Sequence, residues 1–137
     1  MTRPGASACP NSMIHLDTSF LIRAFPTGSS EERALEAWID ADETLAMSAV
    51  AWMEFLSGPL EPSELEFATG IIDHHIDFAP AHAEIAARLF NISGRRRKLF
   101  ADCMIAATAI AENAPIATTN ERDFRRFESE GLTLALA

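Results

Sequence analysis

The chain has 137 residues, of which 48% are hydrophobic and 23% are charged, and its formal net charge at pH 7 is −9. This length and composition predict one globular domain and exclude a disordered or fibrous chain. The net negative charge excludes a surface that is basic on every side, and two cysteines outside any Cys-x-x-Cys pair exclude a thiolate zinc site and a disulfide framework.

The first twelve residues are expected to form a flexible N-terminal tail, because residues 1–12 are rich in Pro, Gly, Ser and Ala and show no periodicity. They lack the apolar core of a signal peptide, and Met13 is a second candidate start. The chain also lacks an apolar stretch of the roughly 20 residues that cross a bilayer, so we expect no membrane association and a cytoplasmic protein. Residues 13–137 are expected to form the single folded domain.

Short apolar strands alternate with helices through this domain. The predicted strands are 14–16, 44–48, 76–78 and 115–118, with 132–136 as an additional edge strand. The predicted helices are one that begins near Thr18 and those over 31–41, 49–57, 62–75, 80–93, 99–112 and 122–128. This alternation predicts an α/β fold in which helices cover both faces of a parallel sheet.

Three acidic residues stand inside apolar runs, where an ionised carboxylate is disfavoured unless cations or several donors compensate it. They are Asp17, Glu54 and Asp102. Asp17 directly follows the first predicted strand, and Glu54 follows the second by about two helical turns. Ligands of parallel sheets bind beyond the carboxyl ends of the strands, so these acids are expected to converge on one cleft. Asp123 follows another strand and would be the fourth acid.

Convergent carboxylates without histidine or cysteine make an oxygen-only site, which suits Mg²⁺ or Mn²⁺ rather than Zn²⁺. Such a site can activate water and stabilise the leaving oxygen of a phosphodiester, so the set predicts phosphoryl hydrolysis. Each acid alone also has a structural explanation. Asp17 could cap a helix, Glu54 could lie at the solvent rim, Asp102 could cap its helix or pair with an arginine, and Asp123 could lie on a surface helix. Only the complete set favours a catalytic site.

The basic residues are concentrated in the last third of the chain. Residues 1–87 contain 3 basic and 14 acidic residues, whereas residues 88–137 contain 8 basic and 6 acidic residues. Two clusters hold most of this positive charge, namely Arg95, Arg96, Arg97 and Lys98, and Arg122, Arg125 and Arg126. Either cluster alone is typical of a solvated helix end. Together they indicate a local approach route for an anion.

Four segments in this order and spacing resemble the PIN-domain nucleases and, among them, the VapC-type toxins of toxin–antitoxin operons. The segments are 16–22, 48–55, 101–109 and 118–124, and the likeness extends from Ile14 to about Leu136. The resemblance implies a three-layer α/β/α sandwich with a central, mostly parallel sheet. It also implies a Mg²⁺- or Mn²⁺-dependent endoribonuclease that forms a homodimer and is neutralised by a cognate antitoxin protein.

The same resemblance implies roles for individual residues. Asp17 and Asp102 correspond to the principal metal ligands, and Glu54 and Asp123 to further acids of the catalytic centre. Supporting polar positions are Thr18, Ser19, Thr119 and Asn120, of which Asn120 would face the metal if the helix of Asp123 were displaced. RNA would approach along the edge formed by the two basic clusters.

Two other functions stay open from the sequence: a catalytically silent PIN-like module that binds a protein, and a PIN nuclease with an RNA-processing or DNA-directed role. The triplet Asp73-His74-His75 is similar to the signature of another phosphoesterase family. We expect it at a helix C-terminus, and the other motifs of that family are absent. Cys103 is expected to be a small core residue rather than a nucleophile, since no histidine stands near it in sequence.

Overall fold

The structure, a computed structural model, describes residues 13–135, and the predicted tail over residues 1–12 lies outside this range. A four-stranded sheet with the order β3-β2-β1-β4 forms the centre of the fold. Its strands are β1 (Met13–Leu16), β2 (Thr44–Ser48), β3 (His74–Ile76) and β4 (Ile116–Ala117). Every pair of neighbouring strands is parallel, which confirms the predicted parallel sheet.

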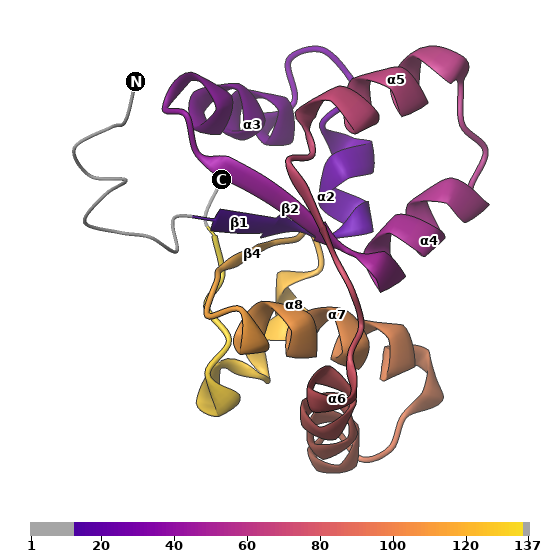
Figure 1. Ribbon diagram of the computed structural model, residues 1–137, viewed down its shortest axis with the longest axis vertical. Coiled ribbons are helices and arrows are strands. Elements are labelled where there is room, and N and C mark those ends of the chain that lie inside the picture. The colour runs from indigo at the N-terminus through magenta and orange to yellow at the C-terminus, as the bar shows by residue number, and fades with distance from the viewer. Residues whose placement is uncertain (1–12, 136–137) are drawn as a thin grey trace.

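Helices cover both faces of this sheet. They are α2 (Thr18–Arg23), α3 (Ser30–Asp40), α4 (Ala49–Ser57), α5 (Pro62–Ile71), α6 (Pro80–Ile92), α7 (Phe100–Ala111) and α8 (Glu121–Arg125), with short 3₁₀ turns η1 (Arg97–Leu99) and η2 (Glu128–Glu130). Helices α2, α3 and α5 lie on one side of the strands, and α6, α7 and α8 lie on the other (Figure 1). The predicted α/β/α sandwich is therefore confirmed. None of the helices in residues 13–135 combines the length and apolar character that a membrane crossing requires.

Two strands pass directly into helices because a polar residue caps each helix at the junction. Asp17 follows β1 and caps α2, and its carboxylate accepts a hydrogen bond from the Thr18 amide at 2.9 Å. Ser48 ends β2 and caps α4, and its hydroxyl accepts a hydrogen bond from the Ala51 amide at 3.0 Å. The Thr18 hydroxyl donates to the Ala51 carbonyl at 2.7 Å, which joins the two helix starts. The capping chemistry thus places both junctions side by side at one edge of the sheet.

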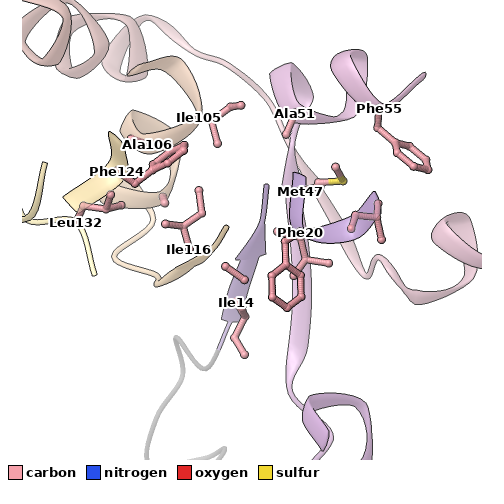
Figure 2. Close-up of a cluster of buried hydrophobic side chains, with 14 of the residues drawn as sticks. Ile14, Phe20, Met47, Ala51, Phe55, Ile105, Ala106, Ile116, Phe124 and Leu132 are labelled. Carbon is pink, nitrogen blue, oxygen red and sulfur yellow. The ribbon is translucent and has the colours of Figure 1, made fainter. Parts of the chain in front are cut away.

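Apolar side chains pack on both faces of the sheet and hold the strand ends in place. Figure 2 shows Phe20, Met47 and Phe55 on one side of the strands and Ile105 and Phe124 on the other. Each of these five side chains is at most 2% exposed. Full burial of such a side chain stabilises a fold by about 1.5–3 kcal/mol. This close-packed core gives the polar residues at the strand ends a rigid support.

The strand β3 begins earlier than predicted. The sequence predicts a helix over 62–75, whereas α5 ends at Ile71 and His74 and His75 belong to β3. The reason is a long-range contact with β2, because the Asp73 carboxylate accepts a hydrogen bond from the Leu45 amide at 2.9 Å and the Asp73 amide donates to the Leu45 carbonyl at 2.8 Å. The triplet Asp73-His74-His75 therefore starts an edge strand rather than ending a helix.

The C-terminal segment is less regular than predicted. The sequence predicts a helix over 122–128, but α8 ends at Arg125 and the chain continues through η2. Phe124 and Phe127 are both fully buried and pack edge to face, and Gly131 then turns the chain with a φ of 105°. Within the described part of the predicted strand 132–136, only an isolated parallel bridge joins Leu134 to Ile116. The packing of two aromatic rings takes precedence over a continuous helix.

His15 makes the fold sensitive to acid. It lies in β1 and is 2% exposed, and its Nε2 atom has no hydrogen-bond partner. Burial, with a smaller contribution from the charge of His82, lowers the pKa of His15 to about 4. The unfolded chain therefore binds more protons than the folded chain below the ordinary histidine pKa of about 6.5. The stability that depends on a neutral His15 is present above this pH and is lost as the pH falls to about 4.

We expect His15→Phe to remove this acid sensitivity. The unfolding free energy of the variant relative to the native chain should rise by on the order of 3 kcal/mol as the pH falls from about 7 to about 4. Denaturant unfolding at a series of pH values measures this difference. A difference that is constant across the series would show that His15 does not titrate in the folded chain.

Candidate active site

The predicted acids lie at the carboxyl ends of parallel strands, as the spacing in the sequence indicates. Asp17 follows β1, and Glu54 lies in α4, which begins where β2 ends. Asp123 lies in α8, a few residues after β4. Asp102 is in the first turn of α7, which contacts α4. Four segments that are far apart in sequence thus contribute one carboxylate each to the same edge of the sheet.

Asp17 is the most enclosed of the four acids, with an exposed fraction of 5%. Its Oδ1 atom accepts a hydrogen bond from the Thr18 amide at 2.9 Å. Its Oδ2 atom accepts from the Ser19 hydroxyl at 2.9 Å and from the Thr118 hydroxyl at 2.8 Å. Burial raises the pKa of Asp17, and these three hydrogen bonds act in the opposite direction. They fix the carboxylate in one orientation and leave Oδ1 with spare acceptor capacity.

The loop after β4 completes this network. The Ser19 hydroxyl accepts a hydrogen bond from the Thr119 amide at 3.2 Å, and the Thr118 hydroxyl accepts from the Asn120 amide at 2.9 Å. Each hydroxyl therefore accepts from a backbone amide and donates to Asp17. The loop at 118–120 is held against Asp17, from which Thr118 is separated by 101 positions in the sequence.

Burial and neighbouring negative charges raise the pKa values of Glu54 and Asp102. Burial and the negative charge of Asp17 raise the pKa of Glu54. Burial also raises the pKa of Asp102 to about 7, with additional contributions from the charges of Asp17, Glu54 and Asp123. A carboxyl whose pKa is raised by three other acids must lie within their electrostatic reach. The structure therefore brings the four predicted acids into one electrostatically coupled group.

Asp123 differs from the other three acids because cations already compensate it. Its Oδ2 atom accepts a hydrogen bond from Asn120 Nδ2 at 3.0 Å, and its Oδ1 atom forms an ion pair with Arg126 Nη2 at 3.1 Å. The hydrogen bond from Asn120 and the charges of Arg126, Lys98 and Arg96 lower the pKa of Asp123. Asp123 therefore belongs to this acidic group and also contacts a basic flank.

The predicted basic residues divide into two sets. Arg96, Lys98, Arg122 and Arg126 line a cavity together with Asn120 and Asp123. Arg125 instead pairs with Glu121 at 3.0 Å and with Glu128 at 3.8 Å. Arg95 and Arg97 are exposed and do not belong to the lining of this cavity. The structure thus singles out four of the seven predicted basic residues.

The acidic group and the polar side chains around it suit a hard divalent cation, because the atoms that could bind a metal are carboxylate, hydroxyl and amide oxygens. As the side chains stand in residues 13–135, no three histidine, cysteine, aspartate or glutamate residues are arranged to hold one metal ion. Cys103, next to Asp102, is buried, and its burial and the adjacent carboxylate raise the pKa of its thiol to about 11. The thiol therefore stays protonated, as expected of a core residue.

A family comparison identifies this arrangement of strands and acids. The family model of the PIN domain matches residues 14–130, which is most of the chain. The chain belongs to the PIN domain family. This membership confirms the resemblance seen in the sequence, and the matched residues include Asp17, Glu54, Asp102 and Asp123. Among curated proteins, none matches the chain.

Several solved structures have a fold similar to that of this PIN domain. VapBC2 from Rickettsia felis bound to a DNA fragment from its promoter superposes with a TM-score of 0.71 at 24% identity, over 90% of this chain and 97% of that chain. A toxin–antitoxin complex from Klebsiella pneumoniae gives 0.66 at 26% identity, over 81% and 89%. VapBC-1 from nontypeable Haemophilus influenzae gives 0.68 at 18% identity, over 90% and 96%. At these identities the likeness establishes the fold.

Thr118 is the residue of the candidate site that the sequence did not single out. The resemblance emphasises Thr119, but the exposed Thr119 contributes its backbone amide, whereas Thr118 is 5% exposed and donates to Asp17. The available signal was position. Thr118 directly follows β4, as Asp17 follows β1, and ends of neighbouring parallel strands meet.

We expect Thr118→Val to destabilise the folded chain and to raise the pKa of Asp17. Valine keeps the shape of threonine but leaves Asp17 with one hydroxyl donor and the Asn120 amide without its acceptor. The unfolding free energy should fall by about 1–3 kcal/mol, and the pKa of Asp17 should rise further. Thermal unfolding measures the first effect, with Thr119→Val as the matched control. Equal stability of the two variants would contradict this role of Thr118.

Proposed function

We propose that this PIN domain is a divalent-metal-dependent endoribonuclease, the toxin of a toxin–antitoxin pair. It hydrolyses RNA phosphodiester bonds at the acidic group formed by Asp17, Glu54, Asp102 and Asp123. The convergence of four carboxylates from distant segments carries this proposal, because burial of Asp102 and, next, the charges of Asp17, Glu54 and Asp123 raise the pKa of Asp102 to about 7. Such repulsion is unfavourable unless a cation offsets it, and perturbed carboxylates of this kind are typical of functional sites.

The residues fit Mg²⁺ or Mn²⁺, because the donors are oxygens and the charge is in excess. Asp17 and Asp102 would hold the ion, and Glu54 and Asp123 would lie beside it. A bound divalent ion supplies an activated water and offsets the charge that develops on the phosphodiester oxygens. Membership of the PIN family supports the hydrolysis of a nucleic acid.

The protein side chains contribute orientation and proton transfer. Ser19 and Thr118 hold Asp17 Oδ2, so the free acceptor capacity of Oδ1 points in a fixed direction. Preorganised ligands of this kind cost little reorganisation when the reaction begins. Burial and the charge of Asp17 raise the pKa of Glu54, so this carboxylate, which would lie beside the ion, accepts a proton from water more readily than an ordinary glutamate does.

We also propose an antitoxin protein as the partner of this chain. The support is the likeness to chains from VapBC and other toxin–antitoxin complexes, which reaches 26% identity for the complex from Klebsiella pneumoniae. A homodimer stays a prediction of the family resemblance. A cytoplasmic location stays a prediction, and it agrees with the proposed RNA substrate.

Cleavage assays with defined metal content test the proposed function. The purified chain should cut single-stranded RNA with Mg²⁺ or Mn²⁺ and should not cut it with excess EDTA. The metal should also raise the unfolding temperature, because it binds only the folded state. An RNA that stays intact under both conditions would overturn the nuclease assignment. The absence of a metal-induced shift as well would leave a catalytically silent binding module.

Metal affinity should depend on pH with a step set by Asp102. Below a pH of about 7 the ion must displace the proton from this carboxyl, so Mn²⁺ affinity should rise with pH from about 5.5 and level off above about 7.5. Isothermal titration calorimetry at several pH values measures the affinity, and buffers of different ionisation enthalpy reveal the released proton. In Asp123→Asn the step should persist at a slightly lower pH, since one repelling charge is gone. An affinity that does not change with pH would exclude Asp102 as a ligand.

A further inference from the structure

A basic cavity adjoins the acidic group. It has a volume of about 370 Å³ and is lined by Arg96, Lys98, Asn120, Arg122, Asp123 and Arg126. Its walls come from two segments that are distant in sequence, the η1 region before α7 and the α8 region after β4. The fold therefore joins the two basic clusters of the sequence into one concave surface.

The cavity has positive charge in excess. Among the residues of 13–135 that line it, the one carboxylate is Asp123, which already forms an ion pair with Arg126. Within the described residues, the ion pairs of this region use Arg125 and Arg126, and none of them uses Arg96, Lys98 or Arg122. Three cations that repel one another in a concave site are stabilised by an anion that lies between them.

The cavity and the acidic group share one residue. Asp123 lines the cavity and contributes to the field at Asp102, and it also feels the charges of Lys98 and Arg96. An anion in the cavity therefore lies next to the acidic group rather than on a separate face. A nucleic acid backbone carries regularly spaced phosphates, so a strand whose scissile phosphate is at the acidic group has another phosphate close by.

We propose that the cavity of Arg96, Lys98, Arg122 and Arg126 binds a backbone phosphate of the RNA, next to the phosphate that is cleaved. This inference rests on the proposed function and adds a subsite to it. Arginine guanidinium groups present paired donors that match phosphate oxygens, and lysine adds a compact charge. The subsite also accounts for how an acidic protein holds an anionic strand.

Binding of a short single-stranded RNA in EDTA tests the subsite without cleavage. Lys98→Gln and Arg122→Gln should each weaken binding several-fold. Each should also make the fall of log affinity with log salt concentration shallower, by about 0.7 in the slope. Arg97→Gln and Arg125→Gln are the matched controls, because they remove one positive charge at neighbouring positions outside the cavity lining. Equal effects in all four variants, or no effect in the first two, would overturn the subsite.

The native chain offers a second measurement, because Lys98 is its only lysine. RNA bound in EDTA should slow acetylation of the Lys98 amine, as followed by peptide mass spectrometry. An unchanged rate at saturating RNA would overturn the proposal, and so would equal protection by a polyglutamate peptide. The subsite and the nuclease function can be separated. If RNA protects Lys98 from acetylation and Lys98→Gln binds RNA more weakly, the subsite stands. If the native chain then cuts no RNA with Mn²⁺, the nuclease function alone is refuted.

Discussion

Asp102→Asn is expected to abolish metal-dependent RNA cleavage and to stabilise the metal-free fold. Asparagine has the shape of aspartate but carries no charge, so it removes the cost of burying the carboxylate and the repulsion by Asp17, Glu54 and Asp123. Because the folded pKa of about 7 lies above the unfolded value, the charged carboxylate costs stability once the pH exceeds the unfolded pKa of about 4. The variant should therefore unfold at a higher temperature at pH 7.5 in EDTA, while its cleavage rate falls by about a thousandfold or more.

Asp123→Asn is the matched comparison, because it makes the same chemical change in the same group of acids. The pKa of Asp123 is lowered by Asn120 and nearby cations, so its charge stabilises the folded chain. Its removal should lower the unfolding temperature or leave it unchanged. Thermal unfolding of both variants in EDTA gives the sign directly. A lower unfolding temperature for Asp102→Asn would show that the charge of Asp102 does not destabilise the metal-free fold.

A comparison of two substitutions at Asp17 should separate its structural role from its catalytic role. Asp17→Asn keeps an oxygen that can cap α2, whereas Asp17→Ala removes the acceptor of Thr18, Ser19 and Thr118. We expect Asp17→Ala to lose about 1–3 kcal/mol of unfolding free energy relative to Asp17→Asn. Both variants should lose cleavage by about a thousandfold or more, because neither presents a charged ligand.

Denaturant unfolding and RNA cleavage with Mn²⁺ measure these two effects, and Ser19→Ala is a milder control that removes one of the three donors. If Asp17→Asn cleaves RNA at the native rate, Asp17 is a structural cap and the proposed centre is wrong. If the two Asp17 variants are equally stable, the hydrogen-bond network does not contribute to the fold.

The fold was largely predictable because the signals that define it are local. Asp17 and Ser48 each stand between an apolar strand and an apolar helix, and capping chemistry reads directly from such a junction. The start of β3 was not predictable in this way. It depends on the hydrogen bonds between Asp73 and Leu45, two residues 28 positions apart, and no local pattern reveals that contact.

The acids of the candidate site were found in the sequence, but the differences between them were not. The environment of Asp123 was partly predictable, since Arg126 stands three positions later, at the C-cap of α8, within reach of an ion pair. The raised pKa of Asp102 could not be predicted from the sequence around it, because it arises from burial in the fold and from charges on three other segments. The donation from Thr118 to Asp17 has the same tertiary origin.

The connection between Asp17 and Thr118 bears on how the chain is made. A ribosome synthesises Asp17 101 positions before Thr118, so a nascent chain that stops between them lacks one hydroxyl donor to Asp17 and also lacks Asp123. The proposed centre can therefore assemble only after the β4 segment has emerged and joined the sheet.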